Sequence, residues 1–176
     1  MCITHGGTLH RFFAGEIEHV LSVKLGVANP PLIDYVVDTL LRFVRMDTVY
    51  KMRTPKGESL TEVAGMLTEA GARVGSAKRA AYRHIGDFTL FWGGMFPEAL
   101  RELQDAGSQD YFLNYCACGQ QAYFLASSMD YCESATDPSS DVLHAMSCNF
   151  QLLAYGLREV RREFESTDAG EQFILL

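Results

Sequence analysis

Long apolar segments are missing from this chain. No stretch reaches the roughly 18 uninterrupted apolar residues that a membrane-spanning helix needs. The first residues, MCITHGGTLHRFF, contain no apolar core of a secretory signal. We therefore expect a cytoplasmic protein with no membrane partner.

Disulfide and zinc frameworks are also missing. The chain has five cysteines, an odd number whose spacing fits no disulfide framework. No Cys-x-x-Cys zinc signature occurs, and Cys116 and Cys118 would point in nearly opposite directions on a helix. We expect the cysteines to be thiols that act as small core residues in a reducing cytosol.

Recognisable catalytic signatures are absent as well. The sequence contains no Walker loop, dinucleotide-binding fingerprint, nucleophile elbow or familiar Ser-His-Asp order. It also has little strand-like alternation and no Asn-Gly or Asp-Gly hairpin signal. The sequence therefore indicates no particular reaction, and it argues against a β-rich fold.

Composition and charge describe an acidic globular protein. The 176 residues are 48% hydrophobic and 21% charged, which allows one domain whose core needs no disulfide or metal. We expect a single helical domain over residues 1–176, with 1–8 and 167–176 loosely ordered. The net charge is −7, although nine Lys or Arg accompany four Asp or Glu between residues 42 and 83. A chain this acidic is a poor nucleic-acid binder, so we expect no nucleic-acid partner.

Apolar residues recur at helical spacing along nearly the whole chain. This pattern predicts an all-α fold, a single-domain bundle of six to seven helices. The expected helices are 9–21, 31 or 32 to about 44, 59–71, 75 or 76 to Pro97, 98–104, 108–129, and a long last helix. Ser59 and Glu62 form a capping-box pattern, and Asp137-Pro138 is expected to cap the last helix. The fourth, sixth and last helices should form the centre.

The last helix carries the clearest apolar pattern. Its seam steps by three and four residues through Leu143, Met146, Phe150, Leu153, Leu157, Val160 and Phe164. A narrow seam of this kind is typical of helix-bundle packing. Together with the apolar carboxyl end from Phe173 to Leu176, it also favours self-association, so a homodimer is one expectation.

The stretch HIGDFTLFWGGMFPEAL, residues 84–100, places a carboxylate on apolar ground. A buried carboxylate is costly unless it is paired, so Asp87 serves either a ligand or the packing of helices. The ligand-binding candidates are His84, Asp87, Phe88, Trp92 and Gly94. We favour the structural role, with partners from Arg83, His84, or a tyrosine or backbone N–H group of another helix. Gly93-Gly94 is interpreted as a helix terminus with a left-handed glycine rather than a point of close approach.

Three helices carry a carboxylate and a histidine three positions apart. The pairs are Glu16/His19, His84/Asp87 and Asp141/His144. This spacing places both side chains on one helix face, and di-iron bundles use Glu-x-x-His pairs of this kind. Only the first pair has that order and those residue types. The alternative hypothesis is therefore a metal site with iron, or haem with His84 or His144 as an axial ligand.

Two motifs resemble a group of uncharacterised bacterial all-helical proteins. One is Pro-x-Leu-Ile-x-Tyr-Val-Val-x-x-Leu-Leu-Arg-Phe-Val over residues 30–44. The other is Arg-x-Ile-Gly-Asp-Phe-x-Leu-Phe-x-x-Gly-x-Phe-Pro-Glu over residues 83–98. The resemblance covers about residues 10–130. It implies a helical fold with a core around Gly86-Asp87 and Gly94, and it implies no activity and no site residue.

Three functional hypotheses follow from the sequence. The first is a non-enzymatic cytosolic helical domain that binds a protein partner or a small ligand and needs no cofactor. The second is the metal or haem protein that uses the acid/histidine pairs. The third is an enzyme in which Asp87 and His84 act as acid and base.

Overall fold

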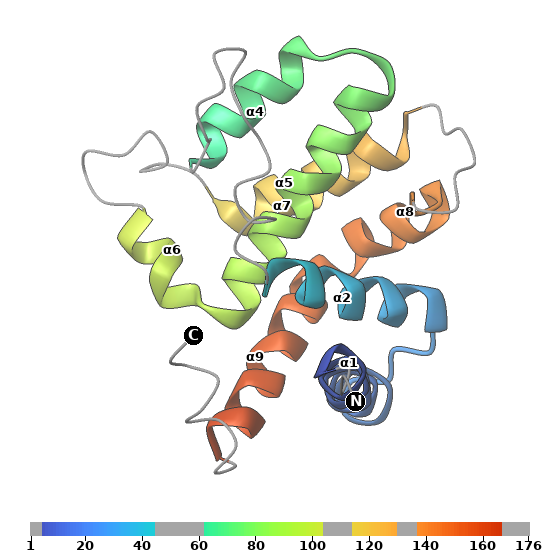
Figure 1. The fold of residues 1–176 in the computed structure, drawn as a ribbon. Helices are drawn as coiled ribbons and strands as arrows, with labels where there is room; N and C mark the ends of the chain where they lie inside the picture. Colours follow the sequence, from blue (N-terminus) through green and yellow to red (C-terminus); the bar gives the residue numbers. More distant parts are fainter. Residues whose placement is uncertain (1–4, 45–61, 104–113, 130–136, 167–176) are drawn as a thin grey trace.

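The structure, a computed structural model, describes residues 5–44, 62–103, 114–129 and 137–166, and within these ranges it contains helices and no β-strand (Figure 1). The helices are α1 (His5–Glu18), the π-helix η1 (His19–Lys24), α2 (Pro30–Phe43), α4 (Val63–Ala72), α5 (Gly75–Met95), α6 (Pro97–Leu103), α7 (Tyr115–Ser127), α8 (Ser140–Cys148) and α9 (Phe150–Ser166). The prediction of an all-α fold is confirmed.

Helix α5 is the centre of the described structure. It packs most extensively against α7, and it also contacts α9, α4, α6 and α2 (Figure 1). Residues 84–91 of α5 are all buried. The expectation that the fourth, sixth and last helices form the centre is therefore correct, because these are α5, α7 and the α8–α9 pair.

Small residues let the helices around α5 approach closely. A Cβ atom on Gly86 would lie 2.7 Å from the ring of Tyr123, and one on Gly94 would lie 2.7 Å from Cβ of Leu157. Neither Gly93 nor Gly94 has a positive φ angle. The interpretation of Gly93-Gly94 as a left-handed helix terminus is wrong, because Gly94 serves the close packing of α5 against α9.

Arginines of α9 satisfy the carbonyl groups at the end of α5. Arg158 donates to the carbonyl oxygen of Gly93 at 3.0 Å, and Arg161 donates to that of Met95 at 2.7 Å. The last carbonyls of a helix have no partner within the helix, so these bonds complete the end of α5.

The long last helix is interrupted. The chain forms α8 and α9, which run in different directions on either side of Asn149 (Figure 1). The backbone N–H of Asn149 still bonds the carbonyl of Ala145, and that of Leu153 still bonds the carbonyl of Asn149. The seam residues from Leu143 to Val160 are buried in the core. The single-helix prediction is wrong, whereas the assignment of the seam to the core is correct.

The amino-terminal helix is longer than expected. It begins at His5 instead of Leu9, and the chain stays helical through η1 to Lys24. Gly26 then adopts a φ of 69° and turns the chain towards α2. Asn29 caps α2 by accepting from the backbone N–H of Leu32 at 3.2 Å, and Pro30 occupies the first turn.

Several expected boundaries fall outside the described residues. Ser59 of the capping box, the start of the sixth helix near residue 108, and residues 167–176 cannot be compared with the structure. Helix α4 begins at Val63, and Glu62 at its N-cap makes no side-chain capping bond. The cap of α8 is Ser139, whose hydroxyl accepts from the N–H of Val142, so the prediction that Asp137 caps this helix is wrong.

Candidate functional site

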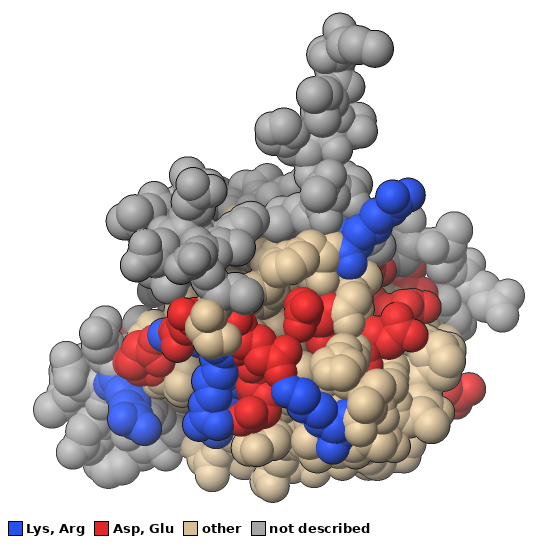
Figure 2. All heavy atoms as spheres, turned by 90° about the horizontal axis from the view of Figure 1, so that it is seen from below, with Lys and Arg blue, Asp and Glu red and all other residues tan. Residues whose placement is uncertain are grey.

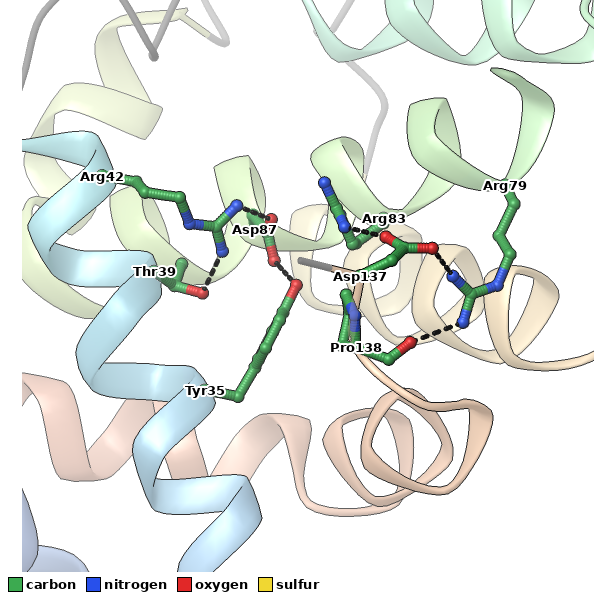
Figure 3. Close-up of polar contacts among 8 residues, drawn as sticks. All are labelled: Tyr35, Thr39, Arg42, Arg79, Arg83, Asp87, Asp137 and Pro138. Atoms are coloured by element: carbon green, nitrogen blue, oxygen red, sulfur yellow. Dashed lines mark hydrogen bonds and ion pairs between the residues drawn. The ribbon is translucent and has the colours of Figure 1, made fainter. Parts of the chain in front are cut away.

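Asp87 is a buried hub that joins three helices. Its side chain is 1% exposed on α5. The hydroxyl of Tyr35 on α2 donates to Oδ1 at 2.6 Å, and the hydroxyl of Tyr123 on α7 donates to the same atom at 2.7 Å. Nη1 of Arg42 on α2 contacts Oδ2 at 3.2 Å (Figure 3). The carboxylate therefore has an opposite charge and two hydroxyl donors within the fold.

The spacing of residues in the sequence places the partners of Asp87 on helix surfaces that face it. Tyr35, Thr39 and Arg42 follow one another by four and three residues, so they share one face of α2. Thr39 accepts from Nη2 of Arg42 at 2.9 Å and orients the guanidinium towards Asp87. On α7, Tyr123 reaches Asp87 because its ring occupies the space that a side chain at position 86 would take.

Burial and the carboxylate hold these groups in the ionisation states that the cluster needs. Burial, together with the negative charge of Asp87, raises the pKa of Tyr35 well above its ordinary value, and the same causes raise that of Tyr123. Burial opposes the charged form of Arg42, but the carboxylate of Asp87 together with the hydroxyls of Tyr35 and Tyr123 outweighs it and raises the Arg42 pKa. The tyrosines thus act as neutral donors and the arginine as a cation.

A second carboxylate is clamped by two arginines one and two turns earlier on α5. Arg79 and Arg83 each pair with one oxygen of Asp137, and Nη2 of Arg79 donates to the carbonyl of Pro138 at 2.8 Å (Figure 3). Arg79, Arg83 and Asp87 are spaced by four residues and share one face of α5. The clamp fastens the segment before α8 to α5, which was not foreseen from the sequence.

The five predicted ligand-binding residues lie on different faces of α5. His84, Phe88 and Trp92 share one face of α5, where the ring of His84 stacks on Phe43 with centroids 5.8 Å apart. Asp87 faces α2 and α7, and Gly94 lies against α9. None of the five lines either of the two cavities described below.

The six residues of the metal hypothesis are spread over four helices. Glu16 lies on α1 and His19 begins η1, whereas His84/Asp87 lies on α5 and Asp141/His144 on α8. Among the residues that the structure describes, no three His, Cys, Asp or Glu side chains are placed to hold a metal ion. Iron or haem binding stays a prediction from the sequence.

A small pocket lies between the α1–η1 helix and α2. Its volume is about 150 Å³. Its apolar wall is formed by Ala14, Val27, Pro30, Ile33 and Val37. The pocket lies where η1, the Gly26 turn and the Asn29 cap lead the chain from α1 into α2.

Polar groups from both helices complete this pocket. Glu18 and Ser22 line it from the α1–η1 side, and Asn29 and Asp34 line it from the α2 side. Both carboxylates are exposed to solvent. Neither forms an ion pair with any residue of the described ranges. This site was not predicted from the sequence, in which its signals are Asn29 before Pro30-Pro31 and one acid a turn before and one a turn after the connector, residues 22–31.

A larger groove lies beside the break between α8 and α9. It has a volume of about 600 Å³ and is lined only by uncharged residues, which are Gln120, Cys148, Asn149, Gln151, Leu152 and Tyr155. The nearby apolar side chains are unusually exposed: Leu152 is 37%, Phe124 46% and Tyr155 47% exposed. This groove therefore combines apolar contact surface with amide donors and acceptors.

Protein-family models, curated proteins and solved structures give no match to the chain. The resemblance to bacterial all-helical proteins is thus supported only to the extent that the described fold is all-helical. No helix in the described ranges has both the length and the apolar character to cross a membrane.

Proposed function

We propose that this protein is a non-enzymatic helical domain that binds a small ligand in the pocket between α1–η1 and α2. The observation that carries the proposal is the pocket itself, one wall of which includes a turn of π-helix. Single π-turns are rare and occur frequently at functional sites, because they change the direction of side chains and backbone groups within a helix. Ser22 lies within this turn and lines the pocket.

The pocket volume limits the size of the ligand. A cavity of about 150 Å³ accommodates a benzene-sized molecule, which has about six non-hydrogen atoms. Small ligands of this size reach dissociation constants of about 0.1 to 1 mM when each atom contributes somewhat less than 1 kcal/mol. The pocket therefore fits a compact metabolite or a single side chain of a partner.

Binding is favoured over catalysis by the position of the polar groups. A carboxyl group that acts as a general acid or base is usually desolvated by its surroundings, whereas Glu18 and Asp34 are both exposed. The buried carboxylate of Asp87 is surrounded by its own protein partners. Its geometry supports a role in fixing the helices rather than in chemistry.

A screen of fragments tests this proposal. Cationic, neutral and anionic fragments of about six non-hydrogen atoms are added to ¹⁵N-labelled protein, and amide shifts are recorded. We expect at least one class to shift the signals of Ser22, Ala28 and Val37. The Ala14→Leu variant, which fills the pocket and keeps its charge, should lose these shifts while retaining the native circular dichroism. No shift from any fragment, or equal binding to the filled variant, would remove the proposal.

A second candidate function is self-association through the groove beside α9. An acidic chain repels its own copies over most of its surface, but the residues that line this groove are uncharged and adjoin exposed Leu152 and Tyr155. We expect Leu152→Glu to lower any dimer fraction measured by sedimentation, and Val74→Glu, at another exposed apolar position, to leave it unchanged. A monomer at millimolar concentration would contradict this candidate.

A further inference from the structure

We infer that the ligand of the α1–η1/α2 pocket is an aliphatic ammonium group: a short alkylamine, or the side chain of lysine on a partner. This inference rests on the proposed function and adds the chemistry of the ligand. It follows from three observations. The wall of the pocket is apolar, two carboxylates lie at its rim, and the nearby lysine and arginine form ion pairs with residues outside the pocket.

The apolar wall favours a ligand whose stem, the part that enters the pocket, has no polar atoms. Ala14, Ile33 and Val37 on the two helices, with Val27 and Pro30 at the connector, form the wall. These side chains offer dispersion contacts and no hydrogen bond, so a polar stem would lose its water without replacement. An unbranched chain of about four carbons with one head group matches the volume of about 150 Å³.

The rim selects a positive head group. Glu18 and Asp34 line the pocket from opposite helices, so a head group at the mouth lies near both carboxylates. Ser22 and Asn29 add oxygen acceptors; Asn29 already accepts from Leu32, but an amide oxygen has a second lone pair. An ammonium group has three donors and no acceptor, which suits a rim made of acceptors.

Cations on the same helices do not neutralise this rim. Lys24 pairs with Glu163, and Arg42 pairs with Asp87. Arg11 lies one turn before Ala14 on α1 and does not line the pocket. Seen from below, acidic side chains gather across the middle of the molecule with a few basic ones among them (Figure 2). The pocket therefore has negative charge available for an incoming cation.

Other ligand classes fit less well. An anion would be repelled by both carboxylates. Calcium takes six to eight oxygen ligands and magnesium six, whereas no three acidic, histidine or cysteine side chains in the described ranges are placed around a metal. A neutral alcohol fits the wall but makes no use of the rim charge. Each exposed carboxylate adds up to about five-fold in affinity for a cation, so two should favour the ammonium by about ten-fold and at most about 25-fold.

The deciding experiment compares three probes of equal chain length. Butylammonium, butanol and butyrate are titrated into the full chain, with dissociation constants measured from amide shifts. We expect butylammonium to bind about ten-fold more tightly than butanol, and butyrate to bind more weakly than both. Raising the salt concentration to 0.5 M should reduce the advantage of butylammonium because exposed charges are screened.

Charge-removing variants then locate the effect. Glu18→Gln with Asp34→Asn should bring butylammonium to within about two-fold of butanol, since only the wall remains. Asp38→Asn removes one carboxylate, as Asp34→Asn does, one turn further along α2 and outside the pocket, and should change affinity less than two-fold. Both effects must appear without a change in thermal stability beyond about 2 °C.

The outcomes separate this inference from the proposed function. If butanol binds at least as tightly as butylammonium, or the double variant keeps the ammonium preference, the inference is overturned although the pocket still binds ligands. If no probe or fragment binds, the proposed function fails with it. A peptide with one lysine distinguishes the two sources of ammonium: tighter binding than butylammonium assigns the site to a partner protein, and weaker binding assigns it to a free amine.

Discussion

Replacing Asp87 with Asn should destabilise the fold by about 3 kcal/mol. The asparagine keeps one oxygen for Tyr35 and Tyr123, but each hydroxyl then bonds a neutral acceptor, which loses about 1 kcal/mol per bond. Its amide group faces Arg42, another donor. Because the Arg42 side chain is 35% exposed and can turn towards solvent, losing its ion pair with Asp87 costs only about 1 kcal/mol.

Urea unfolding is the suitable assay for this variant. It is followed by circular dichroism and by the fluorescence of Trp92, the one tryptophan of the chain. A loss of 3 kcal/mol corresponds to a melting temperature lower by about 6 to 12 °C in a protein of this size. Asp38→Asn, at an exposed position on α2, should change stability by less than about 0.5 kcal/mol.

The same measurement can refute the reasoning. If Asp87→Asn unfolds within about 1 kcal/mol of the native protein, the hub does not hold the helices together. A double-mutant cycle with Tyr35→Phe sharpens the test, because residues in one network should show a coupling of at least about 0.5 kcal/mol. Additive effects would mean that the bond between Tyr35 and Asp87 contributes nothing of its own.

Three further predictions follow from the same contacts. Gly86→Ala should destabilise the protein by about 1 to 3 kcal/mol because the added Cβ would lie 2.7 Å from the ring of Tyr123. Gly15→Ala should instead stabilise it by about 0.5 to 1 kcal/mol, because no neighbouring atom lies within 4 Å of the added Cβ. Urea unfolding of the two variants measures both changes. The raised pKa values of Tyr35 and Tyr123 favour the neutral hydroxyls in the fold, so their contribution is complete below about pH 10 and is lost as the pH rises above it. Tyr35→Phe should therefore lose less stability than the native protein between pH 10 and pH 12. Parallel plots of unfolding free energy against pH for the two proteins would contradict this. Asp137→Asn should lower the stability by about 1 to 3 kcal/mol and increase amide exchange in the first turn of α8, and unchanged exchange would count against the clamp.

The helices could be predicted because their apolar spacing is local. Ile33, Val36, Val37 and Leu40 make a helical stripe in the sequence, and all four are buried in α2. The break at Asn149 could not be predicted in this way. The apolar seam continues across it, no glycine or proline interrupts it, and the backbone hydrogen bonds on both sides keep helical spacing.

The π-turn was missed because tertiary packing produces it. Val20 and Leu21 are adjacent and both completely buried. A regular α-helix turns neighbouring side chains about 100° apart, so the wider turn helps both reach the core. Leu21 packs against Gly156 of α9, where an added Cβ would lie 2.6 Å from its side chain. That contact depends on a residue more than a hundred positions away, beyond any local pattern.

The candidate sites show the same limit. The sequence indicated that Asp87 must be paired and that a tyrosine of another helix was a suitable partner, but Tyr35 and Tyr123 lie 52 and 36 positions away. Only the fold selects them among eight tyrosines. Arg83, expected as a partner for Asp87, instead pairs with Asp137, which was itself interpreted as a helix cap.

The contrast between the two sets of carboxylates determines where ligand binding is expected. Asp87 is buried and is already paired with an arginine and two hydroxyl donors, so its interactions contribute to the stability of the fold. Glu18 and Asp34 lie at the mouth of a pocket, exposed and without an ion pair in the described ranges, so the fold does not depend on their charge. Neutralising Asp87 should therefore lower stability and leave the affinity of the folded protein for butylammonium unchanged, whereas neutralising Glu18 and Asp34 should do the reverse. If Asp87→Asn abolished binding at temperatures where it is folded, the ligand would have to be sought at the hub on α5.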